Sequence, residues 1–168
     1  MSKLQFAHIE YSINTKSLDI FTIGCNGKCV GCCNSEIKKW CNIGMSVYDT
    51  TYKILQLNKK FDNMIDRVII VGGDPVDGYL YDNFSMNFLL NSINEGIKKP
   101  IFLFTRYEIE KVPQDIKNRV QYIKTGEYKP ELLVDKNMWY GINLATSNQK
   151  IYKKVKNDWI LQRSEEWK

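Results

Sequence analysis

Cysteines gather in one short stretch of the chain, "TIGCNGKCVGCC" (22–33), directly after an apolar run. Four of the five cysteines lie there, and Cys25, Cys29 and Cys32 have the spacing CxxxCxxC. The glycines between them let the backbone turn tightly, which would bring the three sulfurs to one side. Because thiolates bind soft metals, the pattern indicates either zinc or an iron–sulfur cluster.

The number of ligands separates these two metals. Structural zinc takes four ligands, usually from two well-separated pairs. No second pair of cysteines follows, since Cys33 directly adjoins Cys32 and Cys41 stands alone. We interpret His8, the single histidine, as an ordinary partly buried or surface residue and not as a metal ligand. Three thiolates suit a [4Fe–4S] cluster with one iron left open. Cys33 and Cys41 stay unassigned, with Cys33 either a small buried hydrophobe or a redox group.

A glycine-rich stretch, "VGGDP" (71–75), ends a later apolar run. Gly72 and Gly73 would let the backbone approach a ligand closely, and Asp74 could accept a hydrogen bond from an ammonium group. Alone, the stretch could also be a β-turn. Its position after a strand and downstream of the cysteines favours ligand binding.

Strands that alternate with helices would position these groups. Apolar runs rich in β-branched and aromatic residues predict strands at 18–24, 66–73, 100–107 and 120–126. Helical periodicity predicts helices at 46–60 and 82–97. The pattern indicates an α/β fold with right-handed crossovers, in which ligands gather at the carboxyl ends of the strands. The cysteines and "GGDP" follow two such ends.

Each predicted helix has its own sequence signals. In the first, Ser46 and Asp49 have capping-box spacing. One face of that helix carries Tyr48, Tyr52 and Leu55. One apolar stripe of the second helix carries Met86, Leu89, Leu90, Ile93 and Ile97.

Size and charge narrow the class of protein. A chain of 168 residues without linkers or repeats predicts a single domain over 1–168. It has no apolar run near the roughly 20 residues that cross a bilayer, so we expect no membrane partner. Clustered cysteines favour a reducing, cytoplasmic setting. The net charge of +5 is spread along the chain, with an excess at "KIYKKVK" (150–156) that is either a solvated face or a docking surface.

The cysteine loop resembles the signature of radical S-adenosylmethionine (SAM) enzymes. Within that superfamily, "CNGKCVGCCNSEIKKW" is most similar to the activating enzymes of anaerobic (class III) ribonucleotide reductases. In those enzymes a glycine precedes the third cysteine, an asparagine lies two places after it, and a tryptophan follows. Gly31, Asn34 and Trp40 match these positions.

Three further stretches carry the resemblance. "VGGDP" resembles the motif that holds the amino end of the SAM methionine. "LFTRYE" (103–108) resembles a strand end at which Thr105 would face the cofactor, or is a plain buried strand. "TSNQKIY" (146–152) resembles a carboxyl-terminal family segment, or is a helix N-cap at Ser147 or Asn148.

The resemblance implies a partial, open (βα) barrel of the radical SAM type, because about five or six mostly parallel strands are too few for a closed barrel. It implies that Cys25, Cys29 and Cys32 hold a [4Fe–4S] cluster whose open iron binds SAM. It also implies that the enzyme forms a glycyl radical on an anaerobic ribonucleotide reductase, with a flavodoxin- or ferredoxin-type electron donor. Asn34 and Thr105 are cofactor-binding residues in this interpretation.

Departures from the family pattern leave two alternatives open. The segment 8–20 lacks the "DGPG"-like element that precedes the first strand in the activating enzymes, and Cys33 stands where an aromatic residue is common. The substrate could therefore be another glycyl-radical enzyme or a small molecule. A different class of protein is a zinc-stabilised nucleic-acid-binding module that uses Cys41 as the fourth ligand. The sequence disfavours it, because basic and aromatic residues are dispersed along the chain. We therefore expect no nucleic acid partner.

Overall fold

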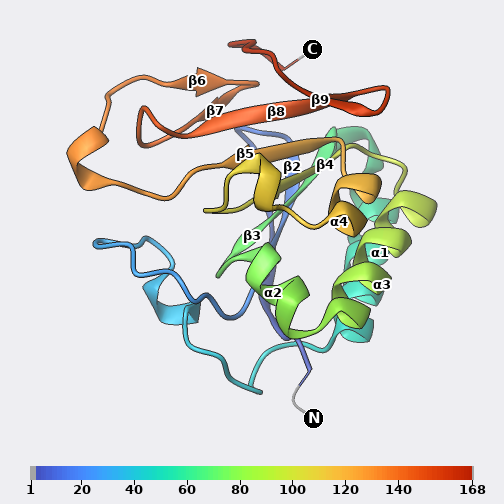
Figure 1. Cartoon of the computed structure of the whole chain (residues 1–168). Helices are drawn as coiled ribbons and strands as arrows, with labels where there is room; N and C mark the ends of the chain where they lie inside the picture. The colour runs from blue at the N-terminus through green and yellow to red at the C-terminus, as the bar shows by residue number, and fades with distance from the viewer. Residues whose placement is uncertain (1–2, 168) are drawn as a thin grey trace.

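A computed structural model describes residues 3–167; residues 1, 2 and 168, which the predicted domain includes, lie outside the described part. A seven-stranded sheet runs through it in the order β1-β2-β3-β4-β5-β8-β9 (Figure 1). These strands span Phe6–Ser12 (β1), Ser17–Thr22 (β2), Arg67–Gly72 (β3), Ile101–Phe104 (β4), Tyr122–Thr125 (β5), Lys150–Val155 (β8) and Asp158–Leu161 (β9). A separate hairpin pairs Met138–Trp139 (β6) with Ile142–Asn143 (β7).

The centre of the sheet is parallel and its edges are antiparallel. Strands β2, β3, β4 and β5 pair in parallel, whereas β1, β8 and β9 are antiparallel to their neighbours. The four predicted strands correspond to this parallel centre and are confirmed. The antiparallel strands, which sequence periodicity missed, bring the sheet to seven strands rather than five or six. In Figure 1, β8 and β9 run across the direction of β2 and β3.

Four helices and four single turns connect the strands. The helices span Val47–Phe61 (α1), Pro75–Tyr81 (α2), Asn83–Gly96 (α3) and Gln114–Arg119 (α4). The 3-10 turns span Ser35–Ile37 (η1), Asp62–Met64 (η2), Ile109–Lys111 (η3) and Pro130–Leu132 (η4). In the described part of the chain, no helix is both long enough and apolar enough to span a membrane.

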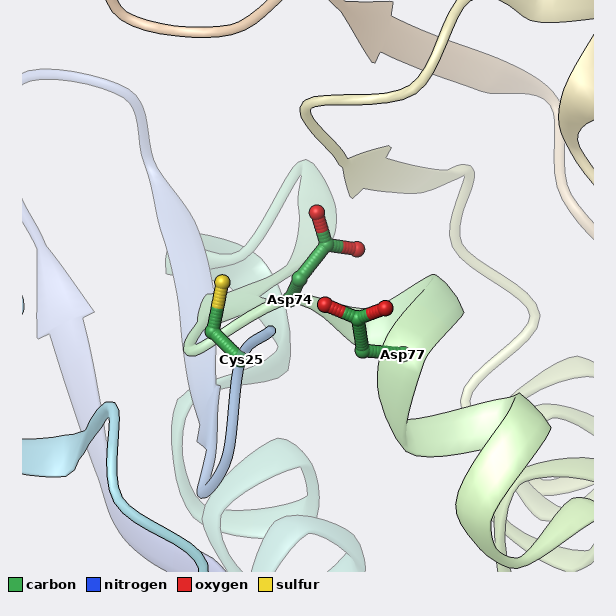
Figure 2. Close-up of side chains that lie close together, drawn as sticks. All are labelled: Cys25, Asp74 and Asp77. Atoms are coloured by element: carbon green, nitrogen blue, oxygen red, sulfur yellow. The ribbon is translucent and has the colours of Figure 1, made fainter. Parts of the chain in front are cut away.

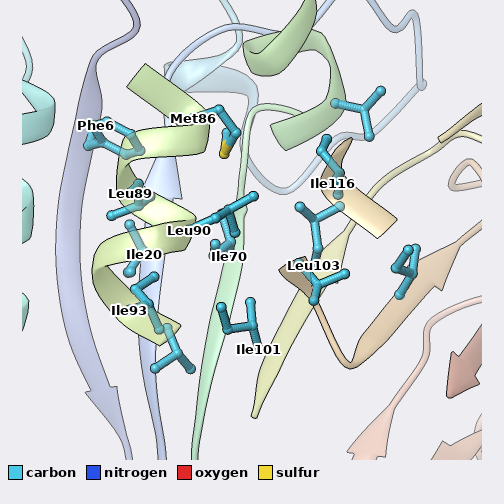
Figure 3. Packing of buried hydrophobic residues seen from close by; sticks show 14 of the residues in the cluster. Phe6, Ile20, Ile70, Met86, Leu89, Leu90, Ile93, Ile101, Leu103 and Ile116 are labelled. Carbon is cyan, nitrogen blue, oxygen red and sulfur yellow. The ribbon is translucent and has the colours of Figure 1, made fainter. Parts of the chain in front are cut away.

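Helix α3 supplies the main core, as predicted. The members of its stripe are all buried. They pack against the apolar face of β2, β3 and β4, where Ile20, Ile70 and Leu103 are fully buried (Figure 3). Removing these side chains from water is the dominant favourable term for this layer.

Helix α1 begins as predicted but buries a different face. Ser46 is its N-cap and accepts a hydrogen bond from the backbone N–H of Asp49 at 3.2 Å. Tyr48 and Tyr52 are 51% and 68% exposed. The buried positions of α1 are Val47, Thr50, Thr51 and Ile54. Tyr48 and Tyr52 of the predicted face therefore point outward, whereas its third member, Leu55, is half-buried against the core.

A second core fills the opposite face of the sheet around a buried arginine. The Arg67 guanidinium donates to the carbonyls of Thr15 at 2.9 Å and Tyr140 at 2.8 Å. It lies over the rings of Phe102 and Trp167, at 5.1 and 4.7 Å from their centroids. Burial lowers the pKa of Arg67 to about 10. The same cluster includes Tyr122 and Trp139.

The segment 146–152 starts a strand and not a helix. Residues 146–149 form a turn in which the Gln149 N–H donates to the Thr146 carbonyl at 3.1 Å, and β8 follows at Lys150. The interpretation of Ser147 or Asn148 as a helix N-cap is therefore wrong. The Asn148 amide instead donates to the Glu127 carbonyl at 2.9 Å, which ties this turn to the loop after β5.

Candidate iron–sulfur site

The carboxyl ends of the parallel strands surround one cavity of about 440 Å³. The loop after β2 carries the cysteines, and the loop after β3 carries "GGDP". These two ends are adjacent because Thr22 of β2 pairs with Gly72 of β3 in parallel register. Each motif follows a strand end as predicted, and the pairing of β2 with β3 brings the two together at one edge of the sheet.

Cys25, Cys29 and Cys32 all line this cavity, and so does Cys33. None of the five cysteines forms a disulfide, and Cys41 is not among the residues that line the cavity. Burial raises the pKa of the Cys25 and Cys29 thiols in the metal-free chain. Three free thiols around one cavity form a donor set that fits a soft metal cluster.

The two glycines of "GGDP" allow the backbone after β3 to lie in close contact with the backbone at the end of β2. A Cβ on Gly72, whose φ is +111°, would lie 2.5 Å from the backbone nitrogen of Thr22. A Cβ on Gly73 would lie 2.1 Å from the carbonyl oxygen of Gly24. Both glycines also line the cavity, so ligand approach stays a prediction. Their first physical role is to let the β2 and β3 loops touch.

Asn34 joins the cysteine loop to the glycine loop. Its side-chain amide donates to the Gly72 carbonyl at 2.9 Å, and Asn34 lines the cavity. On the other side of the loop, the Trp40 ring packs on Gly24, where a Cβ would lie 2.2 Å from Trp40 Cε3. The backbone N–H of Cys25 donates to the Lys38 carbonyl at 2.9 Å. These contacts hold the loop in one conformation.

Asp74 and Thr105 hold each other at the ends of β3 and β4. Asp74 Oδ1 accepts from the Val76 N–H at 2.9 Å and from the Thr105 hydroxyl at 2.8 Å. Asp74 Oδ2 accepts from the Arg106 N–H at 2.9 Å. Burial raises the pKa of Asp74, and these bonds act in the opposite direction. Both residues line the cavity, but their side-chain oxygens already form hydrogen bonds within the protein. Their contacts with a cofactor therefore stay predictions.

Asp77 is a site residue that the sequence analysis missed. Its fully buried carboxylate accepts from the Asn26 N–H at 2.8 Å, from the Tyr107 hydroxyl at 2.6 Å and from Arg106 Nη2 at 3.2 Å. Burial is the largest cause and the hydrogen bond to Asp77 the second; together they raise the pKa of Tyr107 to about 12. The "DPVD" pattern was the available signal, because Asp followed by Pro predicts a helix start that would place Asp77 in the first turn.

Cys25, Asp74 and Asp77 lie close together (Figure 2), with their potential ligand atoms all within 4.8 Å of one another. A hard cation would need free carboxylate oxygens at this point. Both carboxylates already accept hydrogen bonds from protein groups, and the Arg106 guanidinium supplies the compensating positive charge at 3.2 Å from Asp77 and 3.8 Å from Asp74. The arrangement is therefore a structural network behind Cys25 and not a cation site.

Lys124 is a second site residue absent from the sequence predictions. It lines the cavity, and its ammonium donates to the Gly126 carbonyl at 2.9 Å. It forms no ion pair with any carboxylate in residues 3–167. Burial lowers the pKa of Lys124 to about 8. An unpaired cation in the wall of a cavity is suited to bind an anionic group.

His8 and Cys41 are both absent from the lining of the cavity. His8 lies on β1, stacks on the Phe21 ring at 4.1 Å and does not line the cavity, which agrees with its interpretation as an ordinary residue. The zinc alternative needed Cys41 beside the other three cysteines, and Cys41 does not line the cavity that those three line.

Comparison with known proteins identifies the family. Neither the curated proteins nor the solved structures include a match to the chain. The family model described as "4Fe-4S single cluster domain" matches residues 16–152, which contain the cysteine loop, "GGDP" and Lys124. That match covers most of the sequence and agrees with three thiols around one cavity. The chain is therefore an iron–sulfur protein that belongs to the 4Fe-4S single cluster domain family.

Proposed function

We propose that the protein is a radical SAM activating enzyme that forms a glycyl radical on an anaerobic ribonucleotide reductase. The observation that carries the proposal is the meeting of Cys25, Cys29 and Cys32 with the glycine loop around one cavity of about 440 Å³. A nucleoside-sized ligand can occupy a cavity of this size. When bound, a [4Fe–4S] cluster supplies the single electron that cleaves SAM to methionine and a 5′-deoxyadenosyl radical.

The protein groups around the cavity bind and orient in this proposal. The three cysteines hold the cluster, and Cys33 is left as a thiol at the exposed rim. Lys124 is the only lysine among the residues that line the cavity, and its ammonium would pair with the SAM carboxylate. Val71 and Phe104 offer apolar contact for the adenosine. The partial radical SAM barrel and the reductase partner belong to this proposal.

Iron content tests the cluster. The chain purified or reconstituted without oxygen is expected to hold about four irons, because three thiolates suit a [4Fe–4S] cluster. Cys29→Ser should lose most of the iron, while the matched control Cys41→Ser should retain it. One zinc and no iron in the wild-type chain, or equal losses from both variants, would end the proposal.

The substrate needs a separate assay. Mixing the reduced protein and SAM with a class III reductase is expected to give a glycyl-radical signal by electron spin resonance. SAM cleavage without such a signal would favour the second candidate, activation of another glycyl-radical enzyme or reaction with a small molecule. That candidate has one observation behind it: residues 8–20, which lack the "DGPG"-like element, form parts of β1 and β2.

A further inference from the structure

An aromatic stack connects the protein surface to the first metal-binding cysteine. The Trp40 ring packs on the backbone of Gly24, and its Nε1 donates to Asn26 Oδ1 at 3.2 Å. Gly24 and Asn26 are the two neighbours of Cys25 in the chain. Trp40 stacks in turn on Tyr81, with ring centroids 4.3 Å apart, and Tyr81 is 42% exposed.

This stack reaches the cysteine loop from outside the cavity. Neither Trp40 nor Tyr81 is among the residues that line the cavity, whereas Cys25 lines it. A metal group at Cys25 can therefore be approached along two separate sides. The substrate occupies one of them, the cavity. The stack leaves the other side available to a second partner while the cavity is filled.

The cysteine loop and its continuation, which carry Trp40, are basic and have exposed apolar side chains. Lys28, Lys38 and Lys39 belong to the cysteine loop and its continuation, against the single acidic residue Glu36. None of the three lysines forms an ion pair with a carboxylate in the described part of the chain. Two apolar side chains of the same region are also exposed, Val30 at 76% and Ile43 at 91%.

We propose that this surface, the loop lysines with the Trp40–Tyr81 stack, is the docking site for an acidic one-electron carrier protein. The inference rests on the proposed function, which consumes one electron per SAM cleaved. The carrier loses one electron, which passes to the metal group at Cys25, and no bond is formed or broken. Complementary charge steers the encounter, and the aromatic pair provides a contact point beside Cys25.

Binding is measured first, because it does not depend on turnover. The full chain, as purified, is titrated with an oxidised flavodoxin in a calorimeter at low and at physiological salt. Lys28→Glu combined with Lys39→Glu is expected to raise the Kd by about tenfold or more at low salt. The matched control, Lys59→Glu with Lys60→Glu, changes the charge equally at the far end of α1 and should change the Kd by less than about twofold.

Cluster reduction gives the second readout. Reduction is monitored by the loss of visible absorbance. The loop variant and Tyr81→Ala should slow reduction by the flavodoxin and leave reduction by dithionite unchanged. Equal Kd changes for the loop and control pairs, or binding that does not weaken with salt, would overturn the docking proposal. A chain that holds no iron would refute the proposed function instead, and the binding comparison would still decide whether the surface recognises an acidic carrier.

Discussion

Replacing Lys124 by Met is expected to stabilise the metal-free chain and, under the proposed function, to weaken the binding of SAM. Lys124 lines the cavity, and its ammonium donates a hydrogen bond to the Gly126 carbonyl at 2.9 Å. Burial disfavours its charged form and lowers its pKa from 10.5 to about 8. Methionine has a similar length and carries no charge, so the substitution removes the desolvation cost without opening a large cavity.

The size of the effect follows from the lowered pKa. Lowering the pKa from 10.5 to about 8 corresponds to about 3–4 kcal/mol of disfavoured charge. Lys124 is half-buried, because it lines the cavity, and exposure to solvent reduces the cost of its charge. We therefore expect a smaller gain, about 2 kcal/mol in the free energy of unfolding at neutral pH.

The gain should depend on pH with a definite sign. Between about 8 and 10.5 the unfolded chain binds the lysine proton while the folded chain has released it, so the stability of the wild-type chain rises with pH in this window. The difference between Lys124→Met and wild type should therefore shrink towards zero as pH approaches 10.5.

Urea denaturation of the metal-free proteins, followed by circular dichroism, measures this difference. Lys129→Met removes a charge from an exposed lysine of the neighbouring loop and should change stability by less than about 0.5 kcal/mol. With the cluster bound, Lys124→Met should weaken SAM binding by about tenfold, through loss of a charge-assisted contact. A variant that is no more stable than wild type at neutral pH, or a difference that does not change with pH, would refute the reasoning.

Three further substitutions, two in the site and one in the second core, are each measured by urea denaturation. Asp74→Asn places an amide against the Arg106 N–H and should lower the free energy of unfolding by about 2–3 kcal/mol. The same change at Asp82, the half-buried N-cap of α3, should lower it by about 1 kcal/mol. Equal losses of stability would contradict the importance of burial. Gly73→Ala forces the β2 and β3 loops apart and should cost about 2 kcal/mol or more, with loss of iron; a neutral result would contradict the close contact with Gly24. Arg67→Met leaves two carbonyls without a donor and should cost about 2–4 kcal/mol.

Local patterns in the sequence were sufficient for the site's main elements. The apolar runs predicted all four parallel strands, and the stripe of 82–97 predicted the buried face of α3. The spacing of Cys25, Cys29 and Cys32 predicted three thiols at one place, and the cavity contains them. These features depend on neighbours along the chain: the periods of strand and helix, and a short glycine-containing loop.

Long-range packing decided what local patterns left open. The antiparallel strands β1, β8 and β9 and the outward-facing Tyr48 and Tyr52 depend on which partners the rest of the fold offers. Periodicity carries no information on that choice.

The same holds within the site. The sequence by itself determined that three thiols and a glycine loop would each follow the end of a strand. Only the tertiary structure decided that Gly72 and Gly73 touch the β2 backbone, that Asp77 is buried behind Cys25, and that Lys124 reaches the cavity. Backbone contacts and buried charges of this kind join residues far apart in the chain, and their free energies depend on the desolvation that only the complete fold imposes.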